Sequence, residues 1–186
     1  MDHLWAPWRM TYINQPTAPV DDTGCFLCAY ASDPDHDVRN LVLARGEHCF
    51  VVMNRFPYNN GHLMIAPYVH EPTIEELDAT ALTEMMALAQ RCLAAFRAAM
   101  RPDGYNMGIN QGQVAGAGLV GHVHFHMVPR WNGDTNFMPV LGEVKVMPDF
   151  LENTYRQLRE ALLPLLESPP SPPPAARRGR GSRAKS

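Results

Sequence analysis

Long apolar runs are missing from the sequence. No stretch approaches the roughly 18 consecutive apolar residues that a membrane-spanning helix requires, so we expect no membrane partner. The first five residues, Met1–Trp5, lack the basic and apolar blocks of a secretion signal. We therefore expect a cytoplasmic protein.

Cysteine is scarce, with four residues in the chain. Cys49 and Cys92 lie in patterns typical of a strand and of a helix interior, so a disulfide framework fits poorly. Cys25 and Cys28 have the spacing of half a tetrahedral zinc site, and a cytoplasmic location favours thiolate ligands over a disulfide. Two ordinary reduced cysteines are the alternative.

Basic residues are few outside the C-terminal end. Residues 168–186 carry five basic side chains and no acidic one, and subtracting these five charges from the formal net charge of −3 leaves −8 for residues 1–167. A folded part with this net negative charge argues against a general nucleic-acid binder. An anionic ligand must then be held by a local site and not by a broad basic face. We expect a small-molecule ligand.

The composition divides the chain into three segments. Residues 168–186 are rich in proline, glycine, serine and arginine, which predicts a disordered basic tail. A solvated tail is the interpretation that we favour, and a weak contact with RNA or another polyanion is the alternative. Residues 25–167 are long enough for one domain. Residues 1–24 include an aromatic N-terminal arm, for which we favour packing on the domain or on a second subunit over stacking on a nucleobase.

Hydrophobic periodicity predicts an α+β domain. Apolar residues at helical spacing indicate one long helix from an N-cap at Thr73 to about residue 100, and a C-terminal helix over residues 149–166 that is interrupted or ended around Pro164. Short runs rich in β-formers, separated by turn residues, predict a mostly antiparallel sheet of about five strands. The expected strands cover residues 40–44, 48–53, 62–67, 105–110 and 122–128.

Three histidines occupy alternate positions of the last predicted strand. His122, His124 and His126 therefore share one face, while the apolar residues between them point into a core. This spacing suits a three-imidazole metal site or nucleophilic catalysis on phosphorus, and a polar face of idle histidines is the alternative. The glycine-rich loop at residues 110–121 favours phosphorus, because its backbone N–H groups can cradle phosphate oxygens; a flexible turn is the alternative for that loop.

The motif His122-Val-His-Phe-His-Met-Val128 resembles the His-φ-His-φ-His-φ-φ pattern of the histidine triad (HIT) superfamily. The segment Gly61-His-Leu-Met-Ile-Ala-Pro67 looks like the Gly-His-φ-φ-φ-x-Pro strand of the same family. The resemblance covers about residues 25–160 and implies a HIT-like fold with a nucleotide-processing activity. In that family the residue matching His124 attacks an α-phosphate and forms a nucleotidyl-histidine intermediate.

The resemblance also implies roles for other residues. His126 would contact the phosphate or help the leaving group depart. His62 would support the catalytic histidines from the neighbouring strand. A core histidine that is hydrogen-bonded but has no catalytic role is the alternative. Asn54 matches the ribose-binding position, although a turn residue at a strand end is the alternative. The other positions expected to reach the nucleotide are Asn110, Gln111, Ala117 and Gly118.

The same resemblance implies a zinc site. Its four ligands would be Cys25, Cys28, His70 and His122. A tetrahedral shell of two cysteines and two histidines has no open position, so this zinc would stabilise the fold and would not activate water.

Residues 129–137 and the N-terminal arm resemble the bacterial branch that includes diadenosine tetraphosphate phosphorylases. This points to a dinucleoside polyphosphate substrate, with phosphate or water as the acceptor. Those phosphorylases tend to have Gly-Ser where this chain has Ala117-Gly118, which removes a hydroxyl that could bind phosphate. A nucleoside phosphoramidate hydrolase, and a nucleotide-binding, zinc-stabilised interaction module, are the alternative functions. The resemblance further implies a homodimer.

Overall fold

The computed structural model describes residues 24–135 and 149–167. The expected N-terminal arm, apart from Gly24, and the basic tail lie outside these residues. In the part of the chain that is described, no helix combines the length and apolar character needed to cross a membrane.

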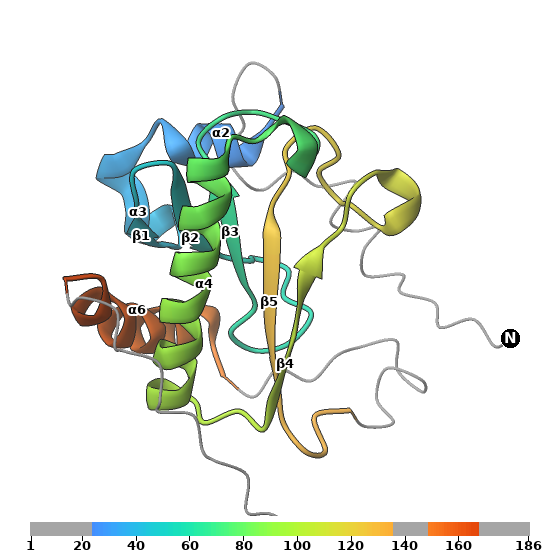
Figure 1. Ribbon diagram of the computed structural model, residues 1–186. Coiled ribbons are helices and arrows are strands. Elements are labelled where there is room, and N and C mark those ends of the chain that lie inside the picture. Colours follow the sequence, from blue (N-terminus) through green and yellow to red (C-terminus); the bar gives the residue numbers. More distant parts are fainter. Residues whose placement is uncertain (1–23, 136–148, 168–186) are drawn as a thin grey trace, which may run out of the picture.

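Five strands form one sheet in the order β1-β2-β3-β5-β4, and every neighbouring pair is antiparallel (Figure 1). The strands are β1 (Val42–Arg45), β2 (Cys49–Met53), β3 (Leu63–Pro67), β4 (Gly104–Ile109) and β5 (Phe125–Arg130). The predicted α+β class with a mostly antiparallel sheet is thereby confirmed.

Helices cover the two faces of the sheet unequally (Figure 1). The long helix α4 (Ala79–Ala99) and the C-terminal helix α6 (Leu151–Glu167) pack against each other, and the core on this side includes Ile65, Phe96 and Leu158. The short helices α2 (Phe26–Ala31) and α3 (Asp37–Asn40) precede β1, and a second apolar cluster forms around α2, β1, β2 and β3. Single 3-10 turns occur at Pro34–His36 (η1), Ile74–Glu76 (η2) and Gln113–Ala115 (η3).

The long helix begins later than predicted. Thr73 makes no side-chain cap, because residues 74–76 form the separate turn η2 and the buried Leu77 that follows is extended. The N-cap is Asp78, whose Oδ1 atom accepts a hydrogen bond of 2.7 Å from the Ala81 N–H group. The predicted N-cap at Thr73 is therefore wrong by five residues.

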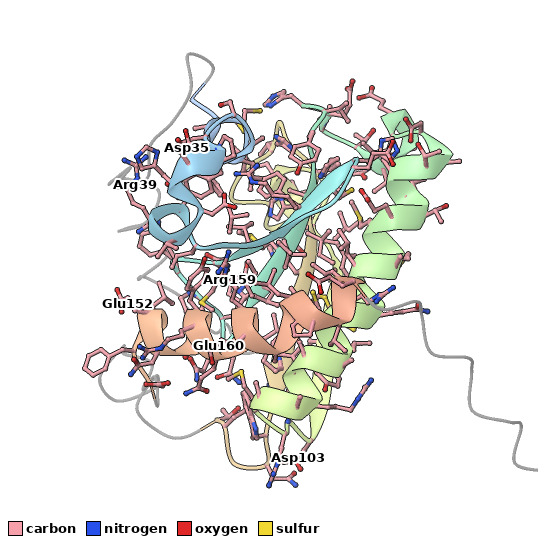
Figure 2. All side chains as sticks on the ribbon, turned by 90° about the vertical axis from the view of Figure 1, so that its left-hand side faces the viewer. Asp35, Arg39, Asp103, Glu152, Arg159 and Glu160 are labelled. Atoms are coloured by element: carbon pink, nitrogen blue, oxygen red, sulfur yellow. The ribbon has the colours of Figure 1, made fainter. Side chains whose placement is uncertain are left out.

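The C-terminal helix runs through Pro164 to Glu167, so the predicted interruption there is wrong. Pro164 lies on the exposed side of α6, where water can solvate the carbonyl group that loses its backbone donor. On the inner side, the Tyr155 hydroxyl donates a 2.9 Å hydrogen bond to the Val42 carbonyl oxygen and ties α6 to β1. Figure 2 shows Arg159 directed from α6 toward the sheet, whereas Glu160 is exposed.

The last strand begins at Phe125 and not at His122. Pairing with β3 ends at the Ile65–Phe125 register position, and the Val123 N–H group donates instead to the Glu71 carbonyl oxygen. The alternation of side chains was predicted correctly, since Val123 and Met127 are buried in the core beneath α4. The histidines consequently face the side of the sheet that carries α2.

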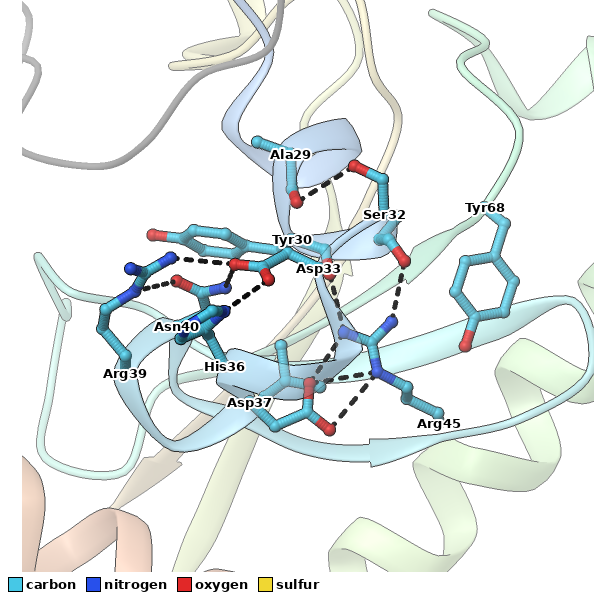
Figure 3. Close-up of polar contacts among 12 residues, drawn as sticks. Ala29, Tyr30, Ser32, Asp33, His36, Asp37, Arg39, Asn40, Arg45 and Tyr68 are labelled. Atoms are coloured by element: carbon cyan, nitrogen blue, oxygen red, sulfur yellow. Dashed lines mark hydrogen bonds and ion pairs between the residues drawn. The ribbon is translucent and has the colours of Figure 1, made fainter.

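Arg45 fixes the end of α2 to β1 (Figure 3). Its guanidinium group donates to the carbonyl oxygens of Tyr30 and Ala31 at 2.6 and 3.0 Å, and it pairs with the Asp37 carboxylate at 2.7 Å. Basic side chains satisfy the free carbonyl groups at a helix C-terminus in this way. Because Cys25 and Cys28 lie at the other end of the same short helix, Arg45 helps to hold them against the sheet.

Candidate active site and metal centre

Three histidines meet on the α2 side of the sheet. His126 lies in β5 opposite Met64 of β3, His62 directly precedes β3, and His124 directly precedes β5. The ring centroid of His126 lies 5.1 Å from that of His62 and 4.7 Å from that of His124. All three side chains are at most 9% exposed. The predicted catalytic residues are thus brought together.

The turn before β3 orients His62. Gly61 has a φ of 76°, and a Cβ atom there would lie 2.9 Å from the Met100 sulfur, so only glycine fits without strain. The Tyr58 N–H group donates to His62 Nδ1 at 3.1 Å, and the Tyr58 ring stacks on the imidazole at 4.7 Å between centroids. On the other side of the ring, His62 Nε2 lies 2.9 Å from His126 Nδ1.

His124 is held as a neutral imidazole. Its Nδ1 atom lies 2.8 Å from the His122 carbonyl oxygen, which can only accept, so the proton of the ring resides on Nδ1. Burial lowers the pKa of His124 below its ordinary value, and the bond to the His122 carbonyl partly opposes this effect. The lone pair therefore lies on Nε2, where a neutral imidazole can act as a nucleophile.

Asn54 lies beside the histidine cluster and beside a small apolar slot. Its Nδ2 atom is 3.4 Å from His62 Nδ1, and its Oδ1 atom accepts a hydrogen bond from the Phe56 N–H group. The slot is lined by Phe26, Tyr30, Met53, Asn54, Arg55, Phe56 and Met64. Sequence reasoning missed the apolar members, since α2 and β3 meet only in the folded chain.

The glycine-rich loop differs in part from the expected phosphate cradle. The N–H groups of Ala115, Gly116 and Ala117 bond back to carbonyl groups inside the loop. The Gln111 side chain accepts from the Ile74 N–H group and donates to the Glu75 carboxylate, so it joins the loop to η2. Asn110 follows Ile109, which pairs with Phe125, and it therefore lies next to the segment of His124. Gly118 is exposed.

The four predicted metal ligands form one cluster. The ligand atoms of Cys25, Cys28, His70 and His122 all lie within 4.8 Å of one another. Cys28 Sγ lies 3.0 Å from His70 Nδ1 and 3.4 Å from His122 Nδ1, close to the roughly 3.5 Å expected between sulfur and nitrogen ligands of tetrahedral zinc.

The second nitrogen of His122 supports metal binding. His122 Nε2 lies 2.9 Å from the Pro67 carbonyl oxygen, so it carries the proton and leaves the Nδ1 lone pair toward the sulfur atoms. Gly121 permits the approach of the other imidazole, because a Cβ atom there would lie 3.3 Å from His70 Nε2. The donor set, the spacing and the tautomer of His122 all fit a structural zinc ion.

Comparison with known proteins places the chain among homologues. The HIT domain family matches residues 36–133. A protein of Mycobacterium tuberculosis named AP-4-A phosphorylase is 38% identical over 161 residues, which span 85% of this chain and 83% of that protein. The crystal structure of a zinc-bound histidine triad family protein from Mycobacterium smegmatis is 29% identical, with a TM-score of 0.62, and covers 78% of this chain and 97% of its own.

A more distant structure shows the same fold. The diadenosine triphosphate hydrolase of Plasmodium falciparum is 17% identical, with a TM-score of 0.53, over 69% of this chain and 78% of its own. The sequence match over more than half of the chain, the antiparallel sheet and the clustered histidines agree. The chain belongs to the histidine triad (HIT) family and is a nucleotide-processing enzyme of that family.

Proposed function

We propose that the protein cleaves a phosphoric anhydride bond of a dinucleoside polyphosphate through a covalent nucleotidyl group on His124. The observation that carries the proposal is the hydrogen bond between His124 Nδ1 and the His122 carbonyl oxygen. It leaves the Nε2 lone pair for attack, and it also stabilises the positive charge that the ring gains when Nε2 bonds to phosphorus. The name of the mycobacterial relative, AP-4-A phosphorylase, supports diadenosine tetraphosphate as the substrate.

The nucleotide would lie across the face that carries α2. In this arrangement the base enters the apolar slot near Phe26 and Tyr30, and the ribose reaches Asn54 at its edge. The phosphates then extend toward His124 and toward the exposed Gly118 of the glycine-rich loop, and Ala117 would lie beside them with its N–H group bonded to the Gly112 carbonyl oxygen. Asn110 would reach the same phosphates, while Gln111 would act by holding the loop against η2.

His126 and His62 complete the proposed site. His126 would contact the phosphate that is attacked, because its ring lies against that of His124. His62 contacts His126 through its own ring and would act by orienting it.

Zinc and dimerisation are further parts of the proposal. Zinc would be held by Cys25, Cys28, His70 and His122. The His122 side chain would bind the metal, while the His122 carbonyl group accepts the hydrogen bond from His124, so the metal would hold the segment that positions the nucleophile. The homodimer stays a prediction, which light scattering of the full chain would measure.

Product analysis with diadenosine tetraphosphate tests the proposal and identifies the acceptor. Attack at the α-phosphorus releases ATP in either case, so ADP as the second product means that phosphate resolves the intermediate, and AMP means that water does. Added phosphate that converts AMP product into ADP product would establish phosphorolysis. An unchanged substrate, with normal nucleotide binding by both the wild type and His124→Ala, would instead indicate a binding module.

A further inference from the structure

A pocket of about 470 Å³ lies between α3 and α6, and none of its lining residues belongs to the histidine cluster or to the metal centre. Its apolar surface comes from Val38 and Leu41 at the end of α3 and from Tyr155 and Leu163 of α6. Val38 and Leu163 are 66% and 36% exposed, so part of this apolar surface is open to solvent. The charged residues that line the pocket all belong to α6 and are Glu152, Arg156, Arg159 and Glu160.

Arg159 lacks acceptors for its guanidinium group. The residue is half-buried and directed from α6 toward the sheet (Figure 2), and its Nε atom is inaccessible to water and has no hydrogen-bond partner. Within residues 24–135 and 149–167, the guanidinium group forms no hydrogen bond and no ion pair. Arginine carries five N–H donors and no acceptor, and a buried donor without a partner costs free energy. The pocket therefore suits an occupant that offers acceptor atoms.

The charges around the pocket favour a neutral occupant over an anion. The exposed carboxylates of Glu152 and Glu160 lie on the same helix as Arg156 and Arg159 and offset their positive charge. A free phosphate or a nucleotide would be repelled by these carboxylates. The carbonyl oxygens of a peptide can accept from a guanidinium group without that repulsion, and apolar side chains can fill the rest of the volume. A peptide segment is therefore the occupant that fits.

The sequence that follows α6 has the matching chemistry. Residues 169–174 read Pro-Pro-Ser-Pro-Pro-Pro and carry no charge, and Arg177 and Arg178 come shortly after them. Such a sequence favours the extended polyproline II conformation, whose carbonyl groups have no internal hydrogen bonds. Proline-rich segments are commonly recognised by apolar surfaces with an aromatic side chain, which Tyr155 supplies in this pocket.

The lengths of the two segments also agree. Arg156 lies eleven residues before the end of α6 at Glu167, which is roughly 16 Å along the helix axis. Polyproline II rises about 3.1 Å per residue, so a chain that turns back at Ser168 covers roughly 19 Å with residues 169–174. The arginines that follow the prolines then reach Glu152.

We propose that the pocket between α3 and α6 binds the chain's own proline-rich segment, residues 169–174, which folds back along α6. In this arrangement Arg159 donates to the proline carbonyl oxygens, the apolar surface contacts the proline rings, and Glu152 attracts Arg177. Because the segment is tethered directly to α6, its effective concentration at the pocket is on the order of millimolar, so weak contacts are enough to occupy the pocket.

Photo-crosslinking in the full-length protein identifies the occupant. A p-benzoylphenylalanine in place of Val38 sets a photoreactive group at the pocket, and the same group in place of Met86 is the matched control on the exposed side of α4. We expect irradiation to join position 38 to the peptide that contains residues 169–174, and position 86 to give none of this product. Peptide mass spectrometry locates the bond.

Three results of this experiment would overturn the proposal. A product between position 38 and residues 1–23 would make the N-terminal arm the occupant. In a mixture of nitrogen-15-labelled and unlabelled protein, a product that joins the two isotopes would mean that the segment comes from a second copy. A yield at position 38 no higher than that at position 86 would mean that the segment does not enter the pocket.

Variants of the pocket and of the segment test the contacts, with the fold checked by circular dichroism. Arg159→Met removes the donors, and Arg97→Met is its control on an exposed position of α4. We expect Arg159→Met to lower the docking equilibrium about tenfold or more, because a hydrogen bond to a charged group typically contributes a factor of that size. The yield from position 38 should fall accordingly, and Arg97→Met should keep it.

Replacing Pro172, Pro173 and Pro174 by serine keeps the length and the charge of the segment and changes no residue of the described domain. We expect the same fall in yield, because serine removes the rings and the preference for polyproline II. This variant still tests the proposal if Arg159→Met does not fold. Yields equal to that of the wild type in the serine variant, or in a folded Arg159→Met protein, would overturn the proposal.

Discussion

His122 contacts Pro67 through its ring, with Nε2 2.9 Å from the Pro67 carbonyl oxygen at the end of β3. The other ring nitrogen faces the sulfur atoms of Cys25 and Cys28 at 3.4 Å. The carbonyl group of the same residue accepts the hydrogen bond from His124. His122 therefore joins the metal centre to the proposed nucleophile. Loss of the metal should change the position of His124 through this one residue.

Replacing a metal ligand should cost stability before chemistry. We expect Cys25→Ser to lose zinc and to unfold at a lower temperature, because the buried cluster then lacks one of its four ligands. Elemental analysis and thermal unfolding measure the two effects. Cys92→Ala is a control, since Cys92 is a buried residue of α4 in the core away from the cluster, and this variant should keep its metal. A Cys25→Ser protein with full zinc content would contradict the assignment.

The four cysteines should react in two classes. Burial raises the pKa of both Cys49 and Cys92 to about 12, so these thiols stay protonated and unreactive in the folded protein at pH 8. We expect iodoacetamide to modify Cys25 and Cys28 after chelation of the metal and to spare the other two. Peptide mass spectrometry with and without chelator measures this, and equal protection of all four after chelation would count against a metal at the pair.

Gly61→Ala should weaken both the fold and the site. A φ of 76° costs a residue with a side chain about 1–2 kcal/mol, and the added Cβ atom would also press on the Met100 sulfur. Because Gly61 directly precedes His62, we expect a loss of kcat beyond the loss of stability. Denaturant unfolding and steady-state kinetics measure the two. A variant as stable and active as the wild type would show that the turn tolerates other backbone angles.

Asp134 should make stability depend on pH. The Arg130 guanidinium beside Asp134 holds the pKa of that carboxyl well below its ordinary value, and Asn59 also donates to it. A depressed pKa stabilises the fold above the unfolded value of about 3.9, and this contribution is lost as the pH falls through the folded value.

We therefore expect Asp134→Asn to lower the free energy of unfolding by roughly 1–3 kcal/mol at pH 7. Below about pH 4 the difference from the wild type should shrink. Urea unfolding across this pH range is the measurement. A difference that stays constant down to pH 2 would show that the charge of Asp134 does not matter.

The sequence allowed prediction of features that follow from local periodicity. Alternation along residues 122–128 placed the histidines on one face, because side-chain direction in an extended chain depends on position alone. The metal ligands were predicted from the family resemblance, and the structure brings all four together. Both the shared face of the histidines and the set of metal ligands follow from residue type and from position in the sequence.

Features that depend on contacts between distant segments were not predictable. Thr73 and Asp78 are both good N-cap types, and the extended Leu77 between them decides in favour of Asp78. The start of β5 at Phe125 reflects the bond from Val123 to Glu71, which no local pattern reveals. The apolar slot likewise joins segments far apart in the chain. So do the hydrogen bonds that Asn59 and Asn60, in the turn before His62, form with Pro129 and Thr154.

The covalent intermediate on His124 can be trapped by rapid quenching of the reaction with diadenosine tetraphosphate. Mass spectrometry of the wild type should show one added adenylyl group on the peptide that contains His124, and the adduct should disappear when the acceptor is supplied. His124→Ala should show none. Turnover by the wild type with no adduct at any time point, or an adduct that persists in His124→Ala, would rule out a nucleotidyl group on His124.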